Sequence, residues 1–150
     1  MPHWDVPSTV TCPRCGASNK VDAGRVKEGL QPLCGRCRAP LSAPTGPLEV
    51  SDSRFEEQVL ASPLPVLLDV WAPWCVPCRG LEPVIEDLAS SLSGQVRVAK
   101  LNVDRSPEAV VRLRIQGVPT VILFKGGHEV NRMVGARSKN DLMRALAGVA

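Results

Sequence analysis

Residues 69–79 read Asp-Val-Trp-Ala-Pro-Trp-Cys-Val-Pro-Cys-Arg, and this stretch decides the fold. The overlapping run 65–71 is nearly all apolar, which is typical of a buried strand. Apolar positions at helical spacing follow Cys75 to about residue 93, with Pro83 expected as a kink. Cys75 is therefore expected where a buried strand leads into the N-terminus of a helix.

This position suits a reactive cysteine. A helix N-terminus exposes unpaired N–H groups and a partial positive charge, and both stabilise a thiolate. We therefore predict that Cys75 is a nucleophile, while Cys78, one turn later and more buried, resolves the intermediate. Pro77 restricts the backbone between them. The alternative interpretation, half of another zinc site, lacks the fourth cysteine pair that it would need.

Strand and helix patterns alternate along residues 50–150. Further strands are expected at 96–103, 120–124 and 130–134, and helices at about 52–60, at 107–113 and after Ser138. Gly126-Gly127 predicts a tight turn between the last two strands. Strands separated by helices indicate parallel pairing, and the hairpin adds an antiparallel edge. The predicted fold class is therefore α/β.

Asp69 is a carboxylate within an apolar strand. Burial would raise its pKa and make it a candidate proton carrier. The alternative is a structural Asp that caps or forms an ion pair, with Lys100 on the adjacent predicted strand as a possible partner. The residues alone leave both interpretations open, and they place Trp71 in the core.

The first four cysteines form two closely spaced pairs. Cys12-Pro-Arg-Cys15 and Cys34-Gly-Arg-Cys37 are separated by eighteen residues, a spacing typical of four-cysteine zinc sites. Four cysteine ligands would leave no open position for water, so the Zn²⁺ would be structural. Free thiols or two disulfides are the alternatives.

A stretch rich in Pro, Ser and Gly divides the chain. We predict a zinc-binding module over residues 1–40, a linker over 41–49 and a larger domain over 50–150. The module holds few large apolar side chains, so a metal or disulfides are needed to fold it.

Composition argues against several functional classes. The formal net charge of +3 is not clustered, which argues against nucleic-acid binding. No apolar run approaches the ~20 residues of a membrane helix, and the first residues lack the pattern of a secretory signal. We expect the protein to be a cytoplasmic monomer. Thiols in the cytoplasm stay reduced.

Residues from about 50 to 150 resemble the thioredoxin family along their whole length. The matching pieces are residues 69–79, Pro83, Ala99-Lys-Leu-Asn-Val-Asp104, Gly117-Val-Pro-Thr120, Phe124-Lys-Gly-Gly and Val134-Gly-Ala. With the four-cysteine module in front, the chain resembles the zinc-containing thioredoxin 2 group of bacteria. One departure is Val76, where the family usually has Gly; residues between the cysteines tune the reduction potential.

The resemblance implies a thioredoxin fold, a central mixed sheet flanked by helices. It implies a cis bond before Pro119, which base rates alone would make trans, and a Pro119 that faces the cysteine pair. Val118 would offer backbone hydrogen bonds to an extended substrate. Asp69, near Lys100, would handle the proton of Cys78 through a water. The substrate surface would also include Trp74, Val76, Pro77, Gly117 and Gly135.

The predicted function is protein-disulfide reduction without a bound organic cofactor, on disulfide-containing protein substrates. The resemblance implies that thioredoxin reductase supplies the electrons from NADPH. A net oxidase or isomerase is an alternative that the expected cytosolic location disfavours. An interaction or redox-sensing protein, in which the zinc module docks partners to a thioredoxin-like scaffold, is an alternative of another class. The intact cysteine pair, Asp69 and Pro119 argue against it, because a scaffold needs none of them.

Overall fold

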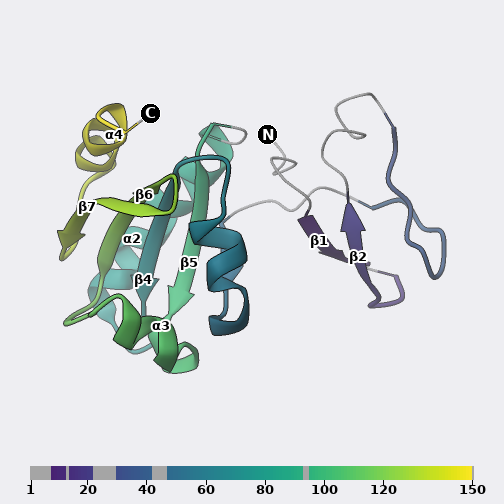
Figure 1. The fold of residues 1–150 in the computed structure, drawn as a ribbon, viewed down its shortest axis with the longest axis horizontal. Coiled ribbons are helices and arrows are strands. Elements are labelled where there is room, and N and C mark those ends of the chain that lie inside the picture. The colour runs from purple at the N-terminus through teal and green to yellow at the C-terminus, as the bar shows by residue number, and fades with distance from the viewer. Residues whose placement is uncertain (1–7, 13, 22–29, 42–46, 93–94, 150) are drawn as a thin grey trace.

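The computed structural model describes residues 8–12, 14–21, 30–41, 47–92 and 95–149. Its main sheet is mixed and has the strand order β3-β5-β4-β6-β7. Figure 1 labels its strands β5, β4, β6 and β7. The strands are β3 (Leu48–Val50), β4 (Val66–Trp71), β5 (Arg97–Asn102), β6 (Thr120–Lys125) and β7 (His128–Val134). β3 and β4 each pair with β5 in parallel, whereas β6 pairs with β4 and β7 in antiparallel fashion. The predicted α/β class with a mixed sheet is confirmed.

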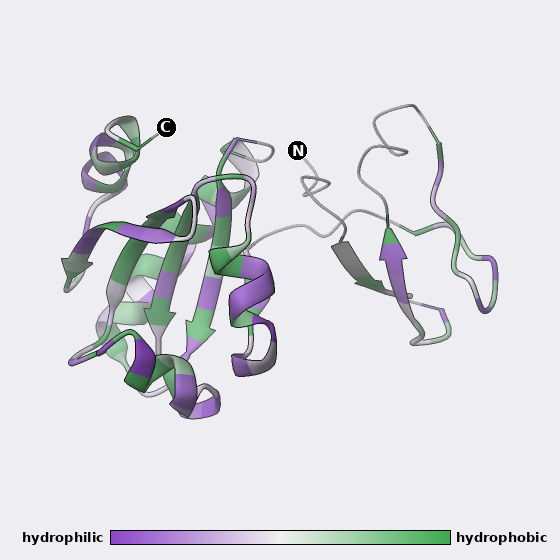
Figure 2. Cartoon of the chain, viewed as in Figure 1, coloured by the Kyte–Doolittle hydropathy of each residue, from purple (hydrophilic) through white to green (hydrophobic). Residues whose placement is uncertain are grey.

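The central strand β4 is buried on both faces. Leu67 packs into one hydrophobic cluster, and Leu68 and Val70 pack into the other, because alternate residues of a strand point to opposite faces. The central strands β4 and β6 are correspondingly apolar along most of their length, whereas β7 at the edge of the sheet mixes polar and apolar residues (Figure 2). Burying each such side chain contributes about 1.5–3 kcal/mol. This rigid strand carries Asp69 and ends just before the redox cysteines.

Helices cover the two faces of the sheet. α2 (Val76–Ser91) and α4 (Lys139–Ala147) pack on the face of Leu67. α3 (Pro107–Arg112) and the helical turn η2 (Glu56–Leu60) pack on the other face. The turn η1 (Asp52–Arg54), which has no buried residue, precedes η2, and η3 (Val103–Arg105) follows β5. The stripe of Leu81, Ile85 and Leu88 gives α2 its buried face. Residue 93, the expected end of this helix, lies outside the described residues.

The helix predicted over residues 52–60 is present, but it is not a regular α-helix. The segment forms a 3₁₀ turn followed by a π-helix, in which the N–H of Ala61 donates to the carbonyl of Glu56. Asp52 does not cap its own helix. Its carboxylate accepts hydrogen bonds from the N–H groups of Glu108 and Ala109 at 3.1 and 2.8 Å. The Asp52 carboxylate thus serves the start of α3, a tertiary contact that local spacing does not reveal.

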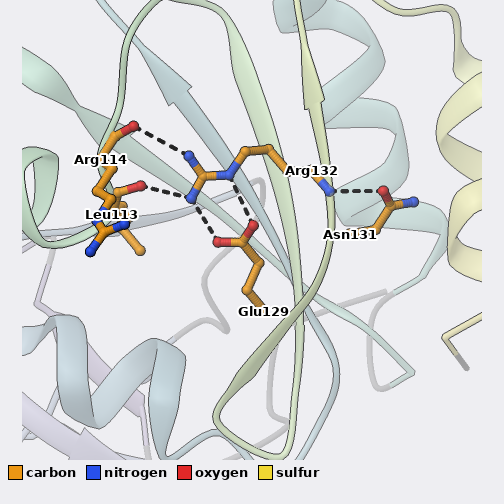
Figure 3. Close-up of polar contacts among 5 residues, drawn as sticks. All are labelled: Leu113, Arg114, Glu129, Asn131 and Arg132. Carbon is orange, nitrogen blue, oxygen red and sulfur yellow. Dashed lines mark hydrogen bonds and ion pairs between the residues drawn. The ribbon is translucent and has the colours of Figure 1, made fainter.

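Arg132 ties β7 to the end of α3 (Figure 3). Its guanidinium donates to the carbonyl oxygens of Leu113 and Arg114, at 2.7 and 3.4 Å, and forms a two-pronged ion pair with Glu129 at 2.6 and 2.9 Å. Arg114 has a positive φ of 54°, where the chain leaves the helix. The contact anchors the segment that leads from α3 to residues 117–119.

The four-cysteine segment has a small core of its own. β1 (Ser8–Thr11) and β2 (Ser18–Val21) form an antiparallel hairpin, and Leu33 and Pro40 form an isolated bridge. Among the residues of this segment whose burial is described, the buried ones are Val10, Cys12, Val21, Cys34, Ala39 and Leu41. Two of these six are cysteines, so much of the core is the cysteine cluster itself.

Two short elements were not expected from sequence. The hairpin of β1 and β2 has only four residues in each strand, and β3 has three, too few for a periodic pattern. β3 includes Leu48 and Glu49, which the predicted linker over residues 41–49 contains; residues 42–46 of that linker lie outside the described residues. None of the helices in the described part of the chain combines the length and apolar character needed to cross a membrane.

Candidate active site and metal site

Cys75 is the N-cap residue of α2, in the position that the sequence predicted for it. Its backbone is extended (φ −89°, ψ 110°), and its Sγ accepts a hydrogen bond from the N–H of Cys78 at 3.2 Å. Pro77 lies in the first turn of the helix, where a backbone N–H would have no partner within the helix, so its missing N–H costs no hydrogen bond. Cys75 and Cys78 are joined as a disulfide, so the structure shows the oxidised state.

The expectation that Cys78 is more buried than Cys75 is wrong for this state. Both cysteines are 4% exposed. They form a small cluster with Ala72, against which the partly buried Val118 and Trp71 pack. Because the disulfide places the two sulfurs against each other, each helps to cover the other. Any difference in accessibility therefore has to arise when the bond opens.

The loop that follows α3 reaches the redox pair through Val118. The Val118–Pro119 bond is cis. The family resemblance implies this, whereas most X–Pro bonds in folded proteins are trans. The carbonyl of Pro119 accepts a hydrogen bond from the N–H of Gly135 at 2.8 Å, and the hydroxyl of Thr120 donates to the carbonyl of Gly117 at 2.7 Å. The segments around Pro119 and Gly135, which lie on different loops in sequence, are thus brought together.

Apolar side chains are exposed next to the disulfide. Trp74 is 66% exposed and Val76 is 74% exposed, although both are large and hydrophobic. The indole N–H of Trp74 donates to Asp104 Oδ1 at 3.2 Å, which holds the ring in one orientation. An exposed apolar surface at a reactive pair suits contact with another protein.

Asp69 lies on β4, buried to 1% exposure. Burial raises the pKa of its carboxyl to about 7, against the lowering effect of the Lys100 ammonium, and Glu82 raises it further. Its Oδ1 has no hydrogen-bond partner among the described residues. A carboxyl that titrates near neutral pH can accept and return a proton under physiological conditions.

Lys100 lies opposite Asp69 in the β4–β5 register, as expected from sequence. Its ion pair, however, is with Glu82, with 3.4 Å between Nζ and Oε1. The ammonium also lies 4.4 Å from the centroid of the Trp71 ring. Glu82 was not expected at the site. The available signal was its spacing: it follows Cys78 by four residues on α2, so both side chains lie on the same side of the helix.

The four N-terminal cysteines come together as predicted. Their sulfur atoms all lie within 4.8 Å of one another, and the Cys12–Cys37 and Cys15–Cys34 sulfurs are 3.6 Å apart. A tetrahedral Zn²⁺ with Zn–S bonds of about 2.3 Å places its sulfurs about 3.8 Å apart. The donor set and its dimensions therefore fit a zinc ion.

The two cysteine turns are built alike. The N–H of Cys12 donates to the carbonyl of Ala17 at 2.9 Å, and the N–H of Cys34 donates to the carbonyl of Ala39 at 2.8 Å. Hydrogen bonds from backbone N–H groups, of Cys37 and then of Arg36, lower the pKa of Cys34 to about 6. Donors directed at the sulfur favour the thiolate, which is the form that binds metal.

In a comparison with known protein families, residues 46–148 match the family model described as Thioredoxin. The thioredoxin of Rickettsia bellii is 48% identical over 94 residues, which cover 63% of this chain and 90% of that protein. Thioredoxin 1 of Nostoc sp. is 43% identical over 98 residues, covering 65% and 92%. The bifunctional thioredoxin reductase/thioredoxin of Mycobacterium leprae is 47% identical over 102 residues, which cover 68% of this chain and 22% of that protein. The family model does not extend to the four cysteines.

Proposed function

The chain belongs to the thioredoxin family, and we propose from this that it reduces disulfides in other proteins through Cys75 and Cys78. It is a thiol–disulfide oxidoreductase, as the members of this family are. The observation that carries the proposal is the position of Cys75 at the N-cap of α2, with the N–H of Cys78 directed at its sulfur. These contacts favour negative charge on the attacking sulfur.

The reaction begins with the reduced pair. The Cys75 thiolate attacks one sulfur of a substrate disulfide, which forms a Cys75–substrate disulfide and releases the other substrate sulfur as a thiolate that takes a proton from water. Cys78 then loses its proton and attacks the Cys75 sulfur. The Cys75–Cys78 disulfide forms, and the second substrate sulfur leaves and is protonated. Two electrons pass from the protein dithiol to the substrate disulfide.

Asp69 is the proposed acceptor of the Cys78 proton, through one water. Its burial and its pKa of about 7 support this role, because a base that titrates near the working pH transfers protons in both directions. Lys100 and Trp71 support the site from β5 and from the end of β4. The competing structural role for Asp69 is less well supported, because its Oδ1 has no hydrogen-bond partner among the described residues.

The substrate surface is proposed to surround the disulfide. Trp74 and Val76 supply exposed apolar area, and Pro77 lies next to them on the first turn of α2. Val118, next to the cis Pro119, packs at the cysteine pair and offers its backbone to an extended substrate chain. Gly117 and Gly135 border this surface and leave room for the substrate backbone.

A structural Zn²⁺ is proposed at Cys12, Cys15, Cys34 and Cys37. The metal would cross-link two turns that share only a small apolar core, and it would occupy all four thiolates. No bound organic cofactor is proposed for the exchange reaction, because the cysteine pair itself stores the electrons. We propose a cytoplasmic monomer that needs neither nucleic acid nor a membrane.

Electrons are proposed to come from a thioredoxin reductase that uses NADPH. The name of the Mycobacterium leprae relative combines the two activities in one protein, which supports this pairing. Insulin-disulfide reduction tests the function directly. A catalytic amount of the protein, with dithiothreitol in excess as the electron source, should accelerate insulin precipitation, and Cys75→Ser should abolish the acceleration. An inactive wild-type protein would contradict the proposed reductase activity.

A further inference from the structure

Three charged groups gather beside the redox pair, one from each of three elements. Asp69 lies on β4, Lys100 on β5 and Glu82 on α2. On the neighbouring strand β6, the residue paired with Asp69 is the apolar Val121. Among the described residues, Lys100 and Glu82 are therefore the charged groups that act on Asp69 from the elements packed against it. Cys78 also lies on α2, and it is held in the disulfide in this structure.

Lys100 is held by groups other than Asp69. Its ammonium pairs with Glu82 at 3.4 Å and lies over the Trp71 ring at 4.4 Å from the centroid. The Lys100 side chain is only 11% exposed, whereas that of Glu82 is 51% exposed. A nearly buried ammonium that contacts an aromatic face and a carboxylate has its position fixed by both. One positive charge is thus shared between two carboxylates.

This sharing weakens what Lys100 can do for Asp69. An undivided ammonium next to a buried carboxyl favours the ionised form and lowers its pKa. Here the charge of Lys100 is partly neutralised by Glu82, and Glu82 itself repels a negative charge on Asp69. Accordingly, Lys100 lowers the pKa of Asp69 and Glu82 raises it.

We propose that Glu82 is a positioning residue for the exchange reaction: by holding Lys100, it keeps Asp69 able to bind and release a proton near neutral pH. The inference rests on the proposed role of Asp69 as the acceptor of the Cys78 proton. In that step the S–H bond of Cys78 breaks and an O–H bond forms on Asp69. Electron transfer follows when the Cys78 thiolate attacks the mixed disulfide.

Removing the charge of Glu82 should make Asp69 a weaker base that is ionised at lower pH. Of the two carboxylates, Asp69 alone would then remain near Lys100, while the Trp71 ring still contacts the ammonium. The rate of mixed-disulfide resolution should rise slightly near pH 6, where more Asp69 is ionised, and fall on the alkaline plateau, where its base strength matters. The two pH profiles should cross, which a merely structural effect of the substitution would not produce.

The test is a carbon-13 NMR titration of the Asp69 carboxyl in the oxidised protein at low ionic strength. In Glu82→Gln the midpoint should move to lower pH by roughly half a unit or more. Glu86→Gln is the matched control, because Glu86 is exposed one turn farther along α2 and its loss changes the net charge equally. Glu82→Asp, which keeps the charge, should titrate close to the wild type. Raising the salt to about 1 M should shrink the difference, since Glu82 is half exposed.

A Glu82→Gln midpoint equal to that of Glu86→Gln would overturn the inference. The underlying role of Asp69 is judged separately, by the resolution rate of Asp69→Asn. If Asp69→Asn resolves mixed disulfides at the wild-type rate from pH 6 to 9, the proposed proton transfer is wrong, even where the NMR midpoint moves. If Asp69→Asn is slow but the midpoint is unmoved, only the role of Glu82 is wrong.

Discussion

The backbone N–H of Cys78 donates a hydrogen bond to the Sγ of Cys75 over 3.2 Å. Cys75 is the N-cap of α2, so its sulfur lies where the unpaired N–H groups of the helix start are directed. When the disulfide opens, these donors favour negative charge on Cys75 rather than on Cys78, which lies inside the first turn. This asymmetry is the physical basis for assigning attack to Cys75 and resolution to Cys78.

The four-cysteine cluster predicts about one Zn²⁺ per chain in protein purified under reducing conditions without chelators. Cys34→Ser should lose the metal and unfold the module, because metal binding supplies most of the folding free energy of such a small segment. Elemental analysis measures the metal, and amide hydrogen exchange over residues 8–41 measures the unfolding. Metal-free wild-type protein would contradict the site.

The redox domain should survive that substitution, since its two hydrophobic clusters involve none of the four cysteines. Arg36→Ser, within the same turn but not a ligand, is the control and should keep its zinc. Loss of the main unfolding transition in Cys34→Ser would contradict the division of the chain into two folding units.

Asp69 should make stability depend on pH. Burial raises its pKa from 3.8 to about 7, so between these pH values the native state holds a proton that the unfolded chain has lost. The free energy of unfolding therefore falls as the pH rises through this window, and the loss from this one group is on the order of 4 kcal/mol at most. It is complete above about pH 7.

Asp69→Asn should remove this contribution. The variant should gain stability relative to the wild type on going from pH 4 to pH 8, because the wild type must bury a charge at the higher pH. Urea unfolding at both pH values, with Asp87→Asn on the exposed side of α2 as the control, measures the difference. A gap between wild type and Asp69→Asn that does not change with pH would show that Asp69 ionises normally.

The Arg132 contact in Figure 3 predicts a stability cost away from the active cysteines. Arg132→Gln should lower the free energy of unfolding by about 1–3 kcal/mol, because the carbonyls of Leu113 and Arg114 lose a charged donor. Arg144→Gln should cost less than about 0.5 kcal/mol, since Arg144 is 80% exposed and 4.0 Å from its acidic partner. Equal urea midpoints for the two variants would contradict this account of the loop.

Much of the redox domain could be predicted from local pattern because its elements are long or strongly marked. The buried run of β4 is apolar except for Asp69, and Ser138 caps α4 through a capping box with Asp141, so both elements were expected. The strands of the four-cysteine segment and β3 are three or four residues long and carry no periodicity. The π-helix at Glu56–Leu60 depends on packing of Phe55 and Val59 into the sheet, which spacing alone cannot distinguish from an α-helix.

The site likewise combines features that local sequence predicts with features that depend on tertiary packing. Cys75 and the four zinc-type cysteines are defined by spacing, which the sequence displays directly. Lys100 was expected beside Asp69 because the strands are adjacent, but its choice of Glu82 as a partner depends on how α2 lies across the sheet. Contacts between elements that are distant in sequence, such as Pro119 with Gly135, could come only from the family resemblance or from the structure.

The order of attack is the central claim, and a trapping experiment tests it most directly. In cells, Cys78→Ser should accumulate covalent complexes between Cys75 and substrate proteins, because the thiol that ends the mixed disulfide is missing. The complexes should dissolve in dithiothreitol, and mass spectrometry of the released partners would identify the substrates. Cys75→Ser should trap almost nothing, and Cys75→Ser with Cys78→Ser should match it. If Cys75→Ser traps as many partners as Cys78→Ser does, the roles assigned to the two cysteines are wrong.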